Sequence, residues 1–320
     1  MSQSISKVSI VPLSWWEPAL ERRLPFELGG GISVENVSSL ISHSDLHLLV
    51  SDPDEQVQVT KWSACLLHKY EVVPDGNLTN ERSRDLLFYV AAHLRLIVPT
   101  TTSFRRCLQA CMGNSQIYLE SYSYSFNRIW LEDCEGMCAQ IKEPHIEKLR
   151  VWVPWIIRLI ENWEGFYPLY LSLHLSERAR LADDPRIRHL LLVMALEALV
   201  SSKNRYGRRT FVPRIKKLLG SNLDLYEKYR CGLQSNLPPL ILGEIIEDVF
   251  ALRNTIAHGD KLRNDWIIPN RRMGKNVRLH HADELREAAT SMLALVWNKI
   301  IDENLQETFA DKSKMKAYFS

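Results

Sequence analysis

Residues 184–202 read DPRIRHLLLVMALEALVSS, and the stretch has the pattern of a helix at the centre of a helical bundle. Asp184 is a good N-cap residue, and Pro185 follows it at the first helical position, where its missing N–H is not needed. The middle is apolar on nearly every side, which predicts burial against several neighbours. Glu197 is the only acidic residue between Asp184 and Ser202, so we expect one carboxylate inside an otherwise apolar helix.

Helical periodicity extends on both sides of this helix, from about residue 145 to residue 301. Apolar residues recur at the spacing of one helix face, and Pro154 predicts a kink in the first of these segments. The other predicted helices cover residues 145–163, 167–182, 211–220, 240–258 and 282–301. Helices of this kind bury their apolar faces against each other, so we expect residues 146–320 to form an all-α helical bundle.

The first 145 residues have a different pattern, in which short β-type runs are separated by turn signals. The runs lie at 5–13, 57–62 and 116–124, the turn signals at 28–33 and 74–77, and one helical segment at 82–98. This pattern predicts a mixed α+β region whose topology the sequence does not assign. The fold class expected for the whole chain is therefore α+β, with a mixed region at 1–145 followed by the bundle.

The composition is that of a soluble globular protein, with 46% hydrophobic and 24% charged residues among 320. This length is more than one core usually needs, which agrees with two domains. The N-terminus lacks the pattern of a signal peptide, and no apolar stretch is long enough to span a membrane. We therefore expect a cytoplasmic protein that does not associate with membranes.

The six cysteines leave two alternatives open. Cys107 and Cys111, like Cys134 and Cys138, have three residues between them, and a zinc site built from the four is conceivable. Structural zinc pairs usually have two residues between them, however, and the same spacing on a helix fits two small buried residues. Burial is the favoured interpretation, so no metal and no cofactor is expected.

The end of the segment 240–258 is unusual for a buried helix. Its apolar stripe continues directly into Arg253, and a buried guanidinium is unfavourable unless it is paired or meets an anion. Glu197 is the natural partner. Asn254 and His258 lie four residues apart on one face, and Gly259 supplies a helix-ending residue. Arg253 and His258 point about 140° apart, so a groove between two copies of the helix would best bring such groups to one phosphate.

The motif RNTIAHGD at 253–260 resembles the signature of HEPN domains, an arginine and a histidine separated by four to six residues. The segment MALEALVSS at 194–202 and the order of the predicted helices resemble the ApeA-like HEPN branch. The resemblance covers residues from about 146 to 305. Known HEPN ribonucleases cut RNA without a metal, as dimers whose two motifs face one cleft.

The resemblance therefore implies a metal-independent endoribonuclease that works as a homodimer. His258 would move the proton of the ribose 2′-hydroxyl or of the leaving 5′-oxygen, since imidazole titrates near neutral pH. Arg253 would bind the scissile phosphate, and Asn254 would orient His258 or the phosphate. Glu197 would position the Arg/His pair or act only structurally. The expected products carry a 2′,3′-cyclic phosphate and a 5′-hydroxyl.

Other interpretations of the same residues remain. A histidine in the last turn interacts favourably with the helix dipole, and an arginine near a helix C-terminus is ordinary. The protein could be a non-catalytic HEPN module that binds nucleotide, RNA or a protein through Arg253 and His258. The family further implies an antiviral-defence or stress effector, in which the N-terminal region senses a phage or protein trigger, or the toxin half of a toxin–antitoxin pair.

Two basic segments flank the motif and predict where RNA binds. No acidic residue lies between Ser201 and Leu218, and Asp265 is the only one between Lys261 and Arg278. Such clustering in a chain of net charge +2 is typical of a polyanion-binding surface, although a solvated basic loop is the alternative. The predicted RNA-binding residues are Arg208, Arg209, Arg214, Lys216, Lys217, Arg271 and Arg272. Tyr206, Phe211 and Trp266 lie among these charges and are expected to stack on bases.

Overall fold

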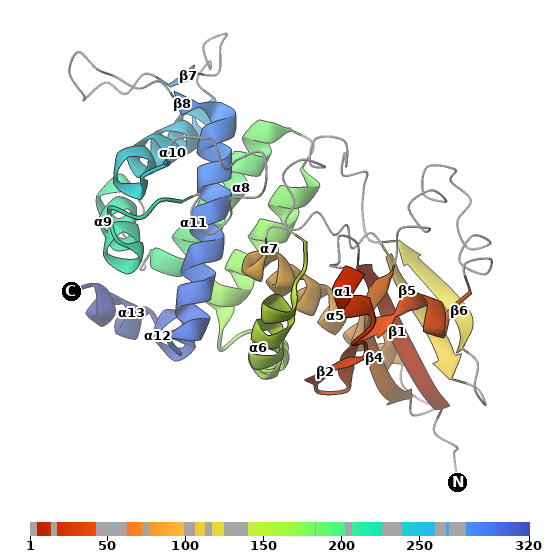
Figure 1. Cartoon of the computed structure of the whole chain (residues 1–320). Helices are drawn as coiled ribbons and strands as arrows, with labels where there is room; N and C mark the ends of the chain where they lie inside the picture. The colour runs from red at the N-terminus through yellow and green to blue at the C-terminus, as the bar shows by residue number, and fades with distance from the viewer. Residues whose placement is uncertain are drawn as a thin grey trace. The chain divides into compact units, whose positions relative to one another are not determined.

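The computed structural model divides the chain into two compact units, Met1–Glu161 and Asn162–Ser320 (Figure 1). Each unit has its own core, and the sheet and the helical bundle belong to different units. The residues described are 5–13, 18–42, 63–72, 77–98, 106–112, 117–124, 140–182, 184–201, 207–225, 239–259, 267–268 and 280–320.

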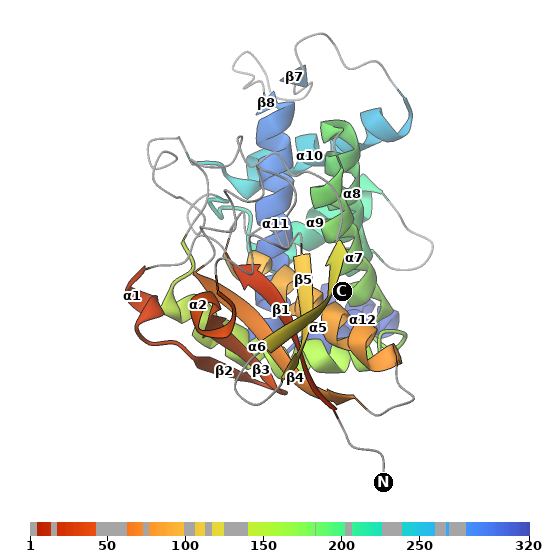
Figure 2. The ribbon, with the colours of Figure 1, turned by 90° about the vertical axis from the view of Figure 1, so that its right-hand side faces the viewer.

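The first unit is built on a six-stranded antiparallel sheet, whose strands appear in Figure 2. Its order is β2-β3-β4-β1-β5-β6, so the first strand of the chain lies inside the sheet, between β4 and β5. The strands are β1 (Ile5–Leu13), β2 (Phe26–Gly29), β3 (Ile32–Asn36), β4 (Ala64–Val72), β5 (Arg106–Met112) and β6 (Ile117–Tyr124). The predicted strands at 5–13 and 116–124 are confirmed as β1 and β6, whereas the run at 57–62 lies outside the described residues.

Glycines at 29–31 make the turn between β2 and β3, within the predicted turn at 28–33. Gly31 has a φ of +76°, and a Cβ added there would lie 2.9 Å from the backbone oxygen of Lys69. A side chain at this position would therefore meet both a strained backbone and a rigid neighbour. This requirement explains why the turn is made of glycine.

Among its described residues, the first unit also contains the helices α1 (Pro18–Glu21), α2 (Val37–Leu40), α5 (Asn77–Ile97) and α6 (Glu143–Glu161). Helix α5 contains the predicted helical segment and packs against β1 and β4. Its Ser83 donates a hydrogen bond of 2.9 Å to Ser9 of β1 and contacts His68 of β4 at 2.7 Å. These bonds join buried hydroxyls, which would otherwise be unpaired between helix and sheet.

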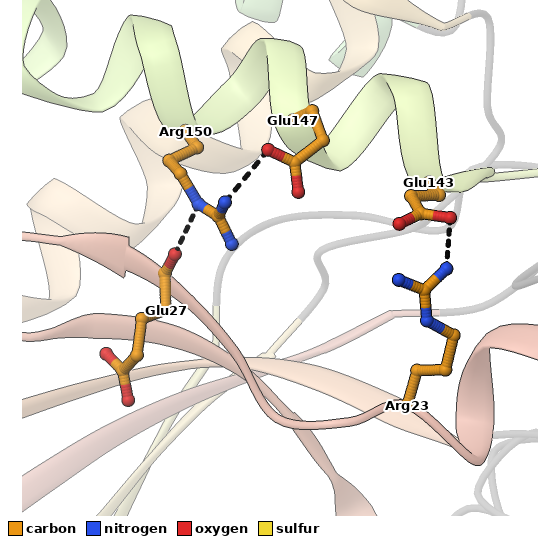
Figure 3. A network of polar contacts seen from close by, with 5 residues as sticks. All are labelled: Arg23, Glu27, Glu143, Glu147 and Arg150. Atoms are coloured by element: carbon orange, nitrogen blue, oxygen red, sulfur yellow. Dashed lines mark hydrogen bonds and ion pairs between the residues drawn. The ribbon is translucent and has the colours of Figure 1, made fainter.

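Helix α6 contacts α5 and β2, so it belongs to the first unit although its pattern resembles that of the helices that follow. Figure 3 shows polar contacts on the side of α6 that faces β2: Arg23 pairs with Glu143, and Arg150 donates to Glu147 at 2.8 Å and to the backbone oxygen of Glu27 at 2.7 Å. The sequence pattern changes near residue 145, where α6 begins, and the units divide where α6 ends. The contacts of α6 with α5 and β2 explain why the unit boundary lies after residue 161 and not near residue 145.

The second unit is a helical bundle that also carries the two-stranded pair β7 (Ile267–Ile268) and β8 (His280–His281). Helix α8 contacts α7, α9, α10 and α11, and α8 and α11 lie side by side in both views (Figures 1 and 2). The helices are α7 (Tyr167–Leu181), α8 (Pro185–Val200), α9 (Arg208–Leu219), α10 (Leu242–Ala257), α11 (Ala282–Asp302), α12 (Gln306–Ala310) and α13 (Lys312–Phe319). The α+β class is therefore confirmed.

Helix α8 begins as its sequence predicts, because the side chain of Asp184 accepts a hydrogen bond of 2.8 Å from the backbone of Arg186. Buried polar groups then tie it to its neighbour: His189 Nε2 donates to the backbone oxygen of Val249 over 3.0 Å. The expectation of burial on nearly every side is wrong for one stripe, where Ile187 is 45% and Met194 is 36% exposed. Two large apolar side chains of α8 are thus exposed to solvent.

Cysteine placement agrees with burial where it is described. Cys65 on β4 and Cys107 on β5 are buried and form no disulfide bond, and burial raises the pKa of the Cys107 thiol to about 12. Within the described ranges, no three His, Cys, Asp or Glu side chains form a group suited to a metal ion. Cys134 and Cys138 lie outside those ranges. None of the helices in the described ranges is long and apolar enough to cross a membrane.

Candidate functional site

The candidate site lies where α10 ends beside α8. The guanidinium Nη2 of Arg253 donates a hydrogen bond of 3.0 Å to Oε2 of Glu197, which joins the two helices. The carboxylate therefore contacts the arginine that the sequence selects as its partner. The guanidinium carbon of Arg253 also lies 5.7 Å from the centroid of the Phe250 ring, so the last aromatic residue of the apolar stripe makes a cation–π contact with it.

Burial of the Arg253–Glu197 pair is unequal. The side chain of Glu197 is 7% exposed, whereas that of Arg253 is 24% exposed. Burial raises the pKa of Glu197, although the charge and hydrogen bond of Arg253 act in the opposite direction. The carboxylate is thus the enclosed partner, and the guanidinium retains contact with solvent.

Three buried polar atoms at this joint have no hydrogen-bond partner among the residues that the structure describes: Oε1 of Glu197, Nε of Arg253 and Oγ of Ser201. Ser201 follows Glu197 by four residues and ends α8, so the two side chains lie on the same side of the helix. Buried polar atoms are nearly always paired in folded proteins. The contact between α8 and α10 therefore has hydrogen-bond donors and acceptors that could serve a ligand. Ser201 was not among the residues that the sequence selected.

The side chain of Asn254 bonds to Arg253, whereas only its backbone oxygen bonds to His258. Its Oδ1 accepts a hydrogen bond of 3.1 Å from Nη1 of Arg253, so the guanidinium is held on two sides. A guanidinium has five N–H donors, and these two bonds leave three: the buried one on Nε, and one each on Nη1 and Nη2 for an anion. The resemblance gives Asn254 the role of orienting His258 or the phosphate; its side-chain contact makes it a support for the group that would bind phosphate.

His258 is the C-cap residue of α10, and its side chain is exposed. Its backbone N–H donates to Asn254 O over 3.0 Å, and Gly259 follows with a φ of +68°, the left-handed turn that ends many helices. The imidazole makes no hydrogen bond with any residue in the described ranges. It is thus accessible to a ligand, and an exposed imidazole can accept or give a proton.

The predicted RNA-binding residues of α9 differ in whether they pair with other residues of the chain. Arg208 pairs with Glu247 of α10, and Lys217 Nζ donates to the backbone oxygen of Ser320 over 3.3 Å. Arg209 is exposed and Lys216 is half-buried, and neither makes an ion pair with a described residue. Arg271 and Arg272 lie outside the described residues. Arg208 and Lys217 therefore have intramolecular partners.

The guanidinium of Arg214 contacts other elements of the bundle. Its Nη1 donates to the backbone oxygen of Val200 at the end of α8, and its guanidinium carbon lies 5.0 Å from the centroid of the Phe319 ring. Burial lowers its pKa. These contacts fix α9 against the C-terminus of α8, near the joint of Glu197 and Arg253.

The expectation that Phe211 stacks on bases is wrong. Its side chain is fully buried and packs on Phe250, with ring centroids 5.1 Å apart. Phe211 lies on the apolar face of α9, which the neighbouring basic residues obscure in the sequence. Tyr206 and Trp266 lie outside the described residues.

Comparison with protein-family models, with curated proteins and with solved structures gave no match.

Proposed function

We propose that this protein is a metal-independent endoribonuclease of the HEPN type that acts as a homodimer. The observation that supports the proposal best is the bond between Arg253 and Glu197, which presents a partly solvent-exposed guanidinium at the end of α10. A partly exposed arginine with spare donors suits the oxygens of a phosphodiester. His258, five residues further on, supplies an exposed imidazole.

The proposed chemistry divides between the two side chains. One imidazole accepts the proton of the ribose 2′-hydroxyl, whose oxygen attacks phosphorus, and a second imidazole gives a proton to the departing 5′-oxygen. Arg253 stabilises the extra negative charge on the phosphate oxygens during attack. The products are a 2′,3′-cyclic phosphate and a 5′-hydroxyl. Glu197 and Asn254 act on the reaction only through Arg253, which they hold.

The proposal includes a second copy of the chain because Arg253 and His258 point about 140° apart on α10 and cannot both reach one phosphate from a single copy. The exposed residues Ile187 and Met194 support such a partner, since they lie seven residues apart on one side of α8. Glu197 follows Met194 by three residues and neighbours it on the helix surface. Docking two copies through this stripe would bring both candidate sites close to the interface.

A non-catalytic module is the second candidate, and one observation favours it. The imidazole of His258 has no described side chain to orient it, whereas general bases in enzymes are commonly oriented by a third group. In this alternative, Arg253 and His258 contact a bound nucleotide or RNA without cutting it.

Cleavage of a labelled single-stranded RNA in the presence of EDTA tests the proposal. We expect His258→Ala and Arg253→Ala to lower the cleavage rate by about 100-fold or more, as loss of a proton-transfer or charge-stabilising group does. His174→Ala is the matched control, because His174 is an exposed histidine of α7 in the same unit. RNA that is bound by the wild type but cut at the same negligible rate by every variant would support the binding module instead.

A further inference from the structure

The fold brings a second basic helix to α9. Helix α9 carries five cations and α13 carries three, and neither helix contains an aspartate or glutamate. The cations are Arg208, Arg209, Arg214, Lys216, Lys217, Lys312, Lys314 and Lys316. The two helices are more than ninety residues apart in sequence, so their combined charge is a property of the folded unit.

Two contacts place the end of α13 on α9. The ring of Phe319 lies under the guanidinium of Arg214 at 5.0 Å, and the backbone oxygen of Ser320 accepts the Nζ proton of Lys217 at 3.3 Å. Phe309 of α12 also holds α13, because its ring contacts those of Tyr318 and Phe319 at 5.7 and 5.9 Å. The aromatic side chains of α13 therefore dock the helix to the bundle.

The lysines of α13 are left available by this arrangement. Lys314 and Lys316 are exposed, and Met315 between them is buried. Lys312, Lys314 and Lys316 form no ion pair with a residue that the structure describes. The adjacent acid, Asp311, instead caps the helix by accepting from the backbone N–H groups of residues 313 and 314, at 2.7 and 3.0 Å.

We propose that α9 and α13, which meet at Arg214 and Phe319, together form a basic surface that binds the sugar–phosphate backbone of RNA. The surface comprises Arg209, Lys216 and Lys217 of α9 with Lys312, Lys314 and Lys316 of α13. This inference rests on the proposed function, because RNA is the polyanion that the candidate site requires. Helix α9 is about 18 Å long at 1.5 Å per residue, which is about five nucleotides at 3.4 Å each along a strand.

The side chains between the cations favour a polyphosphate over a lipid bilayer. Membrane-surface helices present large apolar residues such as Trp, Phe or Leu beside their cations. The most exposed large hydrophobic residues of the described chain lie elsewhere, and neither α9 nor α13 contributes one. Charge without exposed apolar area is the pattern of backbone-directed nucleic-acid binding.

Salt dependence of RNA binding tests the surface. Lys312→Gln, Lys314→Gln and Lys316→Gln are combined in a His258→Ala protein, so that RNA is bound without being cut. We expect weaker binding of a fluorescent single-stranded RNA, and a plot of log affinity against log salt whose slope is shallower by about 2, at roughly 0.7 for each lost phosphate contact. Arg209→Gln, on α9, should act in the same direction with about one third of the effect.

The matched control is the triple variant Arg22→Gln, Lys69→Gln and Lys142→Gln, which removes the same charge from exposed positions of the first unit. Its slope should stay that of the parent protein. Equal slopes for the α13 variant and the parent, with RNA cleavage intact in the wild type, would overturn the surface and leave the nuclease standing. If the wild type neither binds nor cleaves RNA, both the basic surface and the proposed nuclease are overturned. Preferential binding to vesicles of anionic phospholipid would overturn the assignment to RNA.

Discussion

The carboxylate of Glu197 accepts a hydrogen bond of 3.0 Å from Arg253, a residue 56 positions later in the chain. The bond joins the most apolar helix of the bundle to the end of α10, where the exposed imidazole of His258 follows. The position of the guanidinium thus depends on the packing of α8 against α10. Stability and the proposed activity should respond together when this joint is altered.

Glu197→Ala should destabilise the second unit by about 1 to 3 kcal/mol, because it leaves the partly buried guanidinium of Arg253 without its acceptor. Glu197→Gln should lower the stability less, because the amide oxygen can still accept the hydrogen bond from Arg253. The substitution also removes a carboxylate whose charged form is disfavoured by burial, as its raised pKa indicates. Hydrogen exchange of the α8 and α10 amides measures both effects in this unit. Glu164→Ala, at an exposed carboxylate, should stay within about 0.5 kcal/mol of the wild type. A Glu197→Ala protein as stable as that control would show that the bond does not hold the joint.

Strong periodicity and capping made the helices of the second unit predictable. Asp184 caps α8 as expected, and Glu197 could be matched to Arg253 because no other acid was available on that helix. Helices α12 and α13 were not predicted, and their short, charged sequences explain why. The role of Arg214 was hidden for a different reason: its partners, Val200 and Phe319, come from other elements.

The first unit was less predictable because its inner strands β1 and β4 contain consecutive buried residues. In β4, the consecutive residues Leu66 and Leu67 are both fully buried, so the alternation that identifies a half-exposed strand is absent. The four-residue spacing of Cys107 and Cys111 was ambiguous as well. Residues i and i+4 share one face of a strand as well as of a helix, and in the structure both cysteines lie on β5.

Acid should destabilise the α8–α10 contact through His189. Burial lowers the pKa of this histidine to about 4, from an ordinary value of 6.5. Its stabilising contribution is therefore complete above pH 6.5 and is lost as the pH falls towards 4, by about 1.4 kcal/mol per pH unit. His189→Gln should remove that part of the pH dependence, which hydrogen exchange of α8 and α10 at pH 7, 6 and 5 would measure against the wild type. The same pH dependence in both proteins would contradict the assignment.

Phe211→Ala should act on stability and not directly on RNA. Its ring is fully buried against Phe250, and truncation of such a side chain costs about 3 to 5 kcal/mol. Phe211→Leu retains most of the apolar volume and should cost less. Urea unfolding followed by circular dichroism compares the two. A variant that keeps its stability but loses affinity for RNA would restore the stacking interpretation.

Met194→Glu should break the proposed homodimer, because it places a charge in the exposed apolar stripe of α8. Sedimentation over a range of concentrations should give a dimer for the wild type and a monomer for the variant. Val151→Glu is the matched control, since Val151 is 74% exposed and belongs to the first unit. A wild type that sediments as a monomer at every concentration, or a Met194→Glu protein that remains a dimer, would exclude this interface.

The chemistry of the cut ends tests the central claim most directly. RNA incubated with the wild-type protein in EDTA should yield fragments with a 2′,3′-cyclic phosphate and a 5′-hydroxyl, identified by mass spectrometry, and His258→Ala should yield none. These ends are the signature of attack by the neighbouring 2′-hydroxyl. Fragments that end in a 3′-hydroxyl and begin with a 5′-phosphate, or cleavage that stops when EDTA is added, would contradict a nuclease built on Arg253 and His258.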